Sequence, residues 1–245
     1  MERWIHRRGV HVLEEFTVSP LEKRQRTTST EMVRISLDVE GVLSNTHKAV
    51  CARSEQVTEE MMQEWGFPTE DDYKEFMHVS QNLWHNHHEE IPPMESGATF
   101  REVTSGLRDY GHTVDIVTHR HNLTGELADS FESEYGYSPV EVDEQVKAWL
   151  DYYTVEYDNF LAPSEEKDEL DYDVYVDDKP ALAERIANDP ERVIALRDRP
   201  YNQDVDDSSI RVERINSLDE LLFQLTDHYT VEAVRDLCAP PQKVK

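Results

Sequence analysis

A chain of 245 residues with 38% hydrophobic and 9% aromatic residues is long enough for a substantial core and too apolar for a disordered protein. Its formal net charge of −27 opposes sequence-independent binding to nucleic acid polymers, which requires basic patches. No apolar run approaches the roughly 20 residues of a membrane helix, and no apolar leader opens the chain, so we expect no membrane partner. The two cysteines lie far apart and suggest neither a metal site nor a disulfide framework, which favours a cytoplasmic location.

The acidic excess resembles that of cytoplasmic proteins from salt-accumulating, halophilic archaea. A charge of −27 strains a compact state through self-repulsion, and molar salt shortens the Debye length to about 3 Å and screens that repulsion. An ordinary acidic protein from a mesophile is the alternative.

Residues 1–31 differ from the rest of the chain because basic side chains outnumber acidic ones there. The polar stretch "RQRTTSTE" is typical of a linker and ends just before Met32. We therefore predict an N-terminal extension with no part in the chemistry, for which disorder is one candidate state. A strand or helix formed by "VHVLEEFTV" and packed on the core is the alternative.

From Met32 onward, strand patterns alternate with amphipathic helix patterns, which is typical of a parallel sheet. The predicted strands cover residues 33–37, 113–117, 159–161, 173–176, 192–196 and, more weakly, 211–214. The predicted helices between them cover residues 100–110, 123–135, 142–153, 181–187 and 218–227. This pattern predicts an α/β, Rossmann-like three-layer core made of residues 32–45 and 96–229, followed by a C-terminal helix and tail at 230–245.

Residues 46–95 interrupt this alternation because they contain no strand-like run. Two helical patterns, at about 48–65 and 71–88, flank the segment "GFPTED", and Thr69 or Glu70 is placed to begin the second. We predict a small all-helical cap inserted after the first strand, where it would cover whatever lies at the end of that strand.

Polar residues follow three of the predicted strands. Asp38 and Glu40 end the first strand in "VRISLDVEGVLSNT", Thr118 ends the second in "TVDIVTHR", and Asp177 and Asp178 end the fourth in "DVYVDDKP". Ligands of open parallel sheets bind beyond the carboxyl ends of the strands, so we expect these side chains to converge.

Four carboxylates brought together repel one another unless some are protonated or a cation is bound. Mg²⁺ is the usual hard cation beside a phosphate. Thr118 then donates a hydrogen bond to a phosphoryl oxygen, Lys167 in "SEEKDEL" supplies positive charge, and Asp38 is free to attack phosphorus. Each residue alone is weak evidence in a chain with 52 acidic residues; the order and strand-end placement carry the prediction.

The sequence resembles the haloacid dehalogenase superfamily of phosphohydrolases. "DVEGVL" is similar to its first motif, "IVTHR" to its second, Lys167 to its third and "VYVDDKP" to its fourth, over about residues 33–222. The segments "ALRDRPYNQDV" and "RVERINSLDELL" are similar to the C-terminal pattern of the 5'(3')-deoxyribonucleotidase-like branch. The resemblance implies a phosphatase for a small phosphorylated metabolite, with a (deoxy)nucleoside 5'-monophosphate as one candidate.

The resemblance also implies a role for each matching residue. Asp38 is the implied nucleophile, and Mg²⁺ is implied to bind Asp38, the backbone carbonyl of Glu40, Asp177 and Asp178. Thr118 is implied to bind the phosphoryl group and Lys167 to steady its charge and that of the nucleophile.

Glu40 departs from the family, whose phosphatases place Asp there as the general acid and base. Glu is one methylene longer, so a protein that binds phosphate ligands but turns over weakly is the alternative function. A haloalkanoate dehalogenase fits less well, and an acidic scaffold protein is a third class.

Other polar residues are candidates for substrate contact. His119 and Arg120 follow Thr118 directly, and Arg120 suits a phosphate. In the cap, His85 and His88 of "LWHNHHEE" allow a transition-metal site, but a polar helix end is the favoured interpretation. Trp84 or one of these histidines contacting the leaving group is an intermediate hypothesis.

Overall fold

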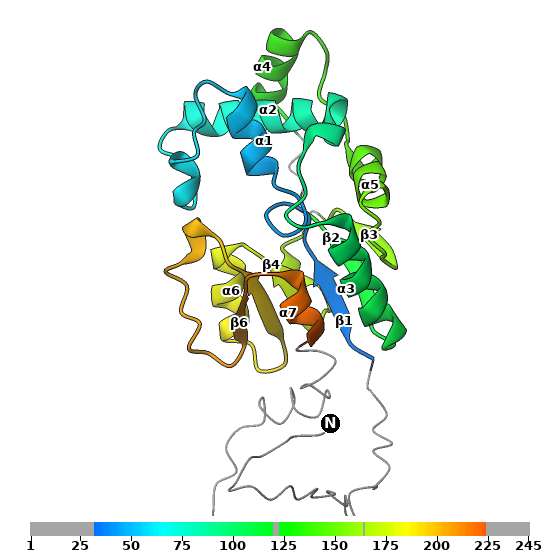
Figure 1. The fold of residues 1–245 in the computed structure, drawn as a ribbon. Coiled ribbons are helices and arrows are strands. Elements are labelled where there is room, and N and C mark those ends of the chain that lie inside the picture. Colours follow the sequence, from blue (N-terminus) through cyan, green and yellow to red (C-terminus); the bar gives the residue numbers. More distant parts are fainter. Residues whose placement is uncertain (1–31, 120–122, 164, 224–245) are drawn as a thin grey trace, which may run out of the picture.

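The computed structural model describes residues 32–119, 123–163 and 165–223 (Figure 1). The predicted N-terminal extension and the C-terminal tail lie outside the described residues, as does the part of the last predicted helix beyond Phe223. Within the described ranges, no helix is both long and apolar enough to cross a membrane.

Six parallel strands form one sheet in the order β3-β2-β1-β4-β5-β6. Their bounds are β1 Arg34–Leu37, β2 Thr113–Val117, β3 Asn159–Leu161, β4 Val174–Asp177, β5 Val193–Arg197 and β6 Val212–Ile215. Each predicted strand is present within a residue or two, including the weak last one. The predicted α/β fold with a parallel sheet is confirmed.

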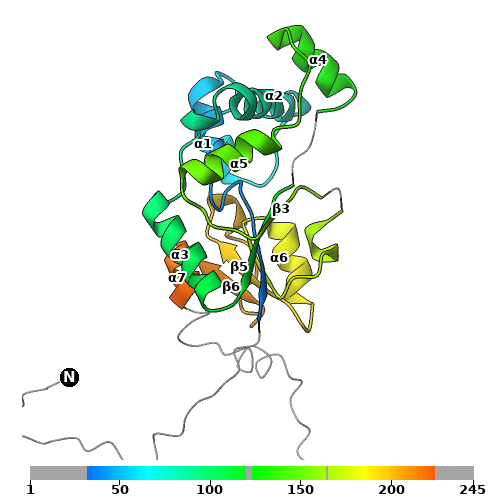
Figure 2. The ribbon, with the colours of Figure 1, turned by 90° about the vertical axis from the view of Figure 1, so that its right-hand side faces the viewer.

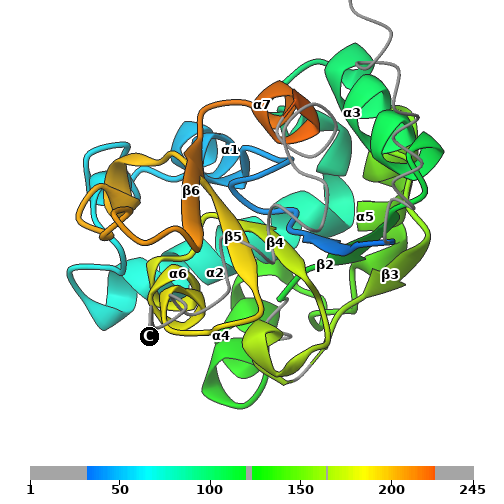
Figure 3. The same cartoon turned by 90° about the horizontal axis from the view of Figure 1, so that it is seen from below.

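The sheet is apolar on both faces, as expected for parallel strands covered by helices on each side. Val174 and Val176 of β4 join one buried cluster, and Tyr175 between them joins the other. Helices α3 (Gly97–Asp109) and α7 (Leu218–Phe223) cover the first face, and α6 (Pro180–Ala187) covers the opposite face (Figure 3). The result is a three-layer core.

The strand order places β1 and β4 side by side at the centre of the sheet. From β1 the chain continues outward to β2 and β3, and from β4 it continues in the other direction to β5 and β6. This reversal of strand order creates a crevice at the carboxyl ends of β1 and β4, the standard ligand position in such sheets.

A helical layer lies over that end of the sheet (Figures 1 and 2). It contains α1 (Thr46–Arg53), the 3-10 helices η2 (Met61–Gln63) and η3 (His88–Glu90), and α2 (Glu70–Asn86). Thr69 caps α2 by accepting a hydrogen bond from the Asp72 N–H, close to the predicted start.

The predicted single helix over residues 48–65 was wrong. Helix α1 ends at Arg53, because the Ser54 hydroxyl accepts hydrogen bonds from the N–H groups of Gln56 (3.1 Å) and Val57 (2.9 Å). These side-chain bonds offer the backbone an alternative to the next helical turn. The chain then continues as loop and 3-10 helix.

Helices α4 (Glu126–Tyr135) and α5 (Asp143–Tyr152) lie between β2 and β3 in the chain, yet α4 lies beside α2 (Figure 2). The buried imidazole of His78 on α2 joins the two helices: Nδ1 lies 3.0 Å from a Glu134 carboxylate oxygen and Nε2 lies 3.1 Å from the Leu127 carbonyl. The helical layer therefore draws on a second chain segment besides the insertion at 46–95.

Candidate active site

The carboxyl ends of β1 and β4 hold three buried aspartates. The Asp38 N–H donates to the Val176 carbonyl (3.0 Å), so pairing with β4 continues one residue beyond β1 and fixes the Asp38 backbone. Asp177 is the last residue of β4, and Asp178 follows it. The structure thus brings together the aspartates that the sequence predicted would meet.

Lys167 lies between two of these carboxylates. Its Nζ is 2.8 Å from Oδ1 of Asp38 and 2.6 Å from Oδ2 of Asp177, and the residue is only 3% exposed. It comes from the short 3-10 helix η4 (Lys167–Glu169), directly before β4. Burial alone would lower the pKa of Lys167, but Asp177 and Asp38 outweigh it and raise that pKa above its usual range. The lysine therefore stays charged and holds both carboxylates.

Asp178 is held by the turn after β5. The Tyr201 hydroxyl donates to its carboxylate, and the Asn202 side-chain amide donates to its backbone carbonyl (3.0 Å). Burial, followed by the charge of Asp177, raises the pKa of Asp178 to about 7. Sequence reasoning noted the "PYN" turn formed by Pro200–Asn202 only as part of a resemblance and assigned it no role.

The loop after β1 approaches Asp178 so closely that only glycine fits at position 41. Gly41 has a φ of +77°, and a Cβ there would lie 1.6 Å from a carboxylate oxygen of Asp178. The turn is closed by the Ser44 N–H, which donates to the Val39 carbonyl (2.7 Å), and by the Gly41 N–H, which donates to the Ser44 carbonyl (2.9 Å).

The donor set of this cluster fits a hard divalent cation. One oxygen from each of Asp38, Asp177 and Asp178 lies within 4.8 Å of the others, and all three residues are buried. Burial raises the pKa of Asp38 well above its usual range; Lys167 opposes this rise, and Asp177 adds to it. One lysine balances only part of the charge of three carboxylates, so a cation with oxygen ligands such as Mg²⁺ would favour their ionised forms.

Glu40 points toward the neighbouring strand. The Thr118 hydroxyl, at the end of β2, donates to a Glu40 carboxylate oxygen (2.8 Å), and Thr118 itself is fully buried. The Thr118 N–H donates to the Leu161 carbonyl (3.1 Å), which fixes the end of β2. The Glu40 side chain is not one of the three clustered carboxylates, so only its backbone carbonyl stays a predicted metal ligand.

Three further residues were predicted to contact the substrate, namely His119, Arg120 and Trp84. His119 lies just beyond Thr118, and its Nε2 is 2.6 Å from the Glu165 carbonyl, in the loop that leads to Lys167. Arg120 lies outside the described residues. Of the residues proposed to contact the leaving group, Trp84 is fully buried and packs against Trp149 (6.1 Å between ring centroids), which does not favour Trp84, and a contact by one of the cap histidines stays a hypothesis.

The histidine-rich end of α2 provides a weaker cluster. One donor atom from each of His87, Glu89 and Glu90 lies within 4.8 Å of the others, with both glutamates exposed. Arg53 already pairs with Glu90. The cluster includes His87 and neither of the predicted histidines His85 and His88, and the favoured interpretation of a polar helix end stays a prediction.

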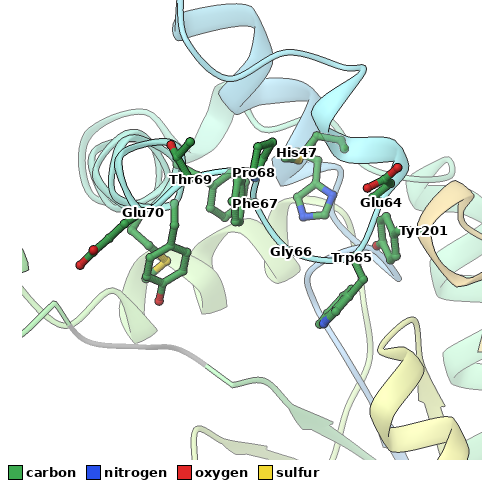
Figure 4. Close-up of a pocket in the computed structure, with 13 residues that line it drawn as sticks. His47, Glu64, Trp65, Gly66, Phe67, Pro68, Thr69, Glu70 and Tyr201 are labelled. Atoms are coloured by element: carbon green, nitrogen blue, oxygen red, sulfur yellow. The ribbon is translucent and has the colours of Figure 1, made fainter.

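A cavity of about 570 Å³ lies between the helical layer and the turn at Tyr201 (Figure 4). Six of its lining residues carry aromatic rings, namely His47, Trp65, Phe67, Tyr73, Phe76 and Tyr201. Since the Tyr201 hydroxyl binds Asp178, this cavity borders the carboxylate cluster. The sequence pattern does not reveal this cavity, because Trp65 and Tyr73 share no periodic pattern with Tyr201.

No known family model matches the sequence, and no curated protein matches it significantly.

Proposed function

We propose that the chain is a Mg²⁺-dependent phosphomonoester hydrolase that acts through an aspartyl-phosphate on a small phosphorylated metabolite. The placement of Lys167 between Asp38 and Asp177 at the central crevice carries this proposal. A buried cation fixed between a candidate nucleophile and a candidate metal ligand suits the transfer of a negatively charged phosphoryl group.

In the first step, a carboxylate oxygen of Asp38 attacks phosphorus. The new Asp38 O–P bond forms as the bond between phosphorus and the leaving oxygen breaks, and Glu40 donates a proton to that oxygen. Once Glu40 turns toward the leaving group, the hydroxyl of Thr118, at the end of β2, donates a hydrogen bond to a phosphoryl oxygen.

In the second step, water attacks the phosphorus of the aspartyl-phosphate. The now ionised Glu40 takes a proton from this water, the Asp38 O–P bond breaks, and inorganic phosphate leaves with Asp38 restored as a carboxylate. Lys167 supports the negative charge of Asp38 in both steps. Mg²⁺ bound at Asp38, Asp177 and Asp178 would neutralise charge on the phosphoryl oxygens.

The contact between Glu40 and Thr118 supports a second candidate, a protein that binds phosphate ligands with little turnover. If this 2.8 Å hydrogen bond persists with ligand bound, neither residue is available for its catalytic task. The substitution Glu40→Asp separates the two candidates. A binder should gain at least tenfold in kcat, whereas an enzyme adapted to glutamate should lose activity.

Phosphate release from a panel of phosphate monoesters, with and without Mg²⁺, tests the leading proposal. The panel contains nucleoside monophosphates, sugar phosphates and p-nitrophenyl phosphate. We expect release that requires Mg²⁺ and falls by at least about 10³-fold in Asp38→Asn, because the nucleophile is lost. Substitution of the exposed Asp71 by Asn is the matched control and should leave the rate unchanged. Release that is equally fast in Asp38→Asn would refute the mechanism.

A further inference from the structure

The cavity in the helical layer has an apolar and aromatic wall. Its volume of about 570 Å³ lies within the range of pockets that enclose small organic molecules. Trp65 is 52% exposed and Tyr73 is 37% exposed, although both are large apolar side chains. Part of each of these two rings is therefore accessible to a ligand.

The rings form a continuous chain of contacts. Phe67 lies 5.7 Å from Tyr73 and 4.9 Å from Phe76, measured between ring centroids. His47 continues the chain, at 5.4 Å from Phe76 and 5.6 Å from Tyr201, and Trp65 is its last member, at 5.4 Å from Tyr201. Such a set of π faces attracts a cation through the ring quadrupoles.

The charges of the wall favour a cation as well. Lining carboxylates come from Glu64 and Glu70, which stand at opposite ends of the row of residues in Figure 4. The 13 described residues that line the cavity include neither Lys nor Arg. His47 adds no positive charge at neutral pH, because burial, followed by the charge of Arg199, lowers its pKa to about 4. Arg199 is not a lining residue, but its guanidinium carbon lies 5.8 Å from the centroid of the Tyr201 ring, so the neighbouring positive charge stands at the Tyr201 end of the cavity. The charged residues of the lining itself, Glu64 and Glu70, favour a cation over an anionic leaving group.

Tyr201 joins this cavity to the carboxylate cluster, since its ring lines the cavity and its hydroxyl binds Asp178. Resting on the proposed function, we propose that the cavity binds the leaving group of the substrate and that this group carries a positive charge. The substrate class is then the phosphate monoester of an amino alcohol or ammonium alcohol. Its phosphate lies at Asp38 and its ammonium group lies against the ring of Trp65, beside Tyr201.

A pair of isosteric substrates tests this assignment. Phosphocholine and 3,3-dimethylbutyl phosphate have the same shape and differ in one atom, a quaternary nitrogen against a carbon. At matched ionic strength, we expect kcat/KM to be about tenfold higher for phosphocholine, as a partly desolvated cation–π contact allows. Equal values, a preference for the neutral compound, or a clear preference for a nucleoside monophosphate would overturn the assignment.

Two sets of variants test whether the preference for phosphocholine arises in this cavity. The double substitution Glu64→Gln/Glu70→Gln and the single substitution Trp65→Leu should each reduce the preference for phosphocholine at least threefold. The double substitution Glu55→Gln/Glu126→Gln removes the same charge from exposed positions outside the cavity lining and should leave the preference intact. An equal loss in both double variants would show a general field effect and overturn the assignment to this cavity.

A binding measurement separates failure of this inference from failure of the proposed function. Choline and 3,3-dimethyl-1-butanol are titrated while tryptophan fluorescence is recorded. We expect a saturable response to choline that is weaker for the neutral alcohol and absent in Trp65→Leu. Without that response, the inference fails even if p-nitrophenyl phosphate is hydrolysed. With it, the cation site stands even if no phosphate is released.

Discussion

At the scale of single residues, the site depends on one buried lysine among acids. Lys167 forms short ion pairs with Asp38 and Asp177, and all three side chains are almost completely buried. Removing one partner of a buried pair leaves an uncompensated charge, which is far more harmful than removing an exposed pair. Lys167 therefore has a structural role as well as its proposed catalytic one.

The substitution Lys167→Met tests this structural role. We expect the metal-free protein to lose about 3–5 kcal/mol of unfolding free energy, because two buried carboxylates then face each other without a cation. Urea denaturation measures this loss, and Lys147→Met, at an exposed ion pair with Glu144, is the control with a much smaller expected loss. Equal losses in the two variants would contradict the account.

The raised pKa of Asp178 should make the stability of the metal-free protein depend on pH. Burial and Asp177 raise this pKa in the folded state from 3.8 to about 7, so the folded state binds a proton more tightly than the unfolded chain. The stabilising contribution of this group is therefore complete below pH 4 and is lost as pH rises to about 7.

Thermal unfolding with EDTA at pH 5 and pH 8 measures this effect. We expect the melting temperature to fall toward pH 8, to fall less in Asp178→Asn, and to recover with Mg²⁺ in the original chain alone. The difference between the two chains separates this group from the general repulsion among 52 acidic residues. Identical pH profiles for both chains would show that Asp178 ionises normally.

At the scale of elements, a short turn provides a side chain that orients a carboxylate at the end of a strand. The turn Pro200–Asn202 brings the Tyr201 hydroxyl to Asp178. Mutation of a side chain that orients a metal ligand commonly lowers metal affinity about 10- to 100-fold. Tyr201→Phe keeps the ring in the cavity and removes only this hydrogen bond.

Calorimetric titration with Mg²⁺ tests the contribution of this turn. We expect the affinity of Tyr201→Phe for Mg²⁺ to fall about tenfold or more, because the Asp178 carboxylate loses the donor that orients it. Tyr110→Phe, at a tyrosine that is 54% exposed, should bind Mg²⁺ as the original chain does. An unchanged affinity in Tyr201→Phe would remove Tyr201 from the metal site.

Sequence patterns predicted the strands better than the helical layer. Buried parallel strands are continuous apolar runs, and the polar residues at their ends identified the cluster of Asp38, Asp177 and Asp178 directly. The end of α1 at Arg53 depends on hydrogen bonds that the Ser54 hydroxyl accepts from backbone N–H groups, which periodicity does not reveal. The placement of α4 beside α2 depends on long-range contacts such as His78 with Glu134, and no local signal encodes those.

At the scale of the whole molecule, the net charge of −27 should make stability depend strongly on salt. Raising KCl from about 0.1 M to 1 M shortens the Debye length from about 10 Å to 3 Å, which screens repulsion between exposed carboxylates. The ion pairs of Lys167 are buried, so salt should screen them much less.

Thermal unfolding across a KCl series measures this dependence. We expect the melting temperature to rise continuously to molar KCl, as for proteins from salt-accumulating archaea. An equal concentration of sucrose is the control for effects unrelated to charge. A melting temperature that is flat or falls with KCl would favour the alternative, an acidic protein adapted to ordinary salt.

The proposed mechanism requires that Asp38 becomes covalently phosphorylated, and this intermediate can be trapped chemically. The protein is mixed with Mg²⁺ and p-nitrophenyl phosphate, quenched with acid and treated with borohydride, which reduces an aspartyl-phosphate to homoserine. Mass spectrometry should find homoserine at position 38, and no such product when substrate is omitted or in Asp38→Asn. Hydrolysis by the original chain without any modified residue at position 38 would rule out Asp38 as the nucleophile.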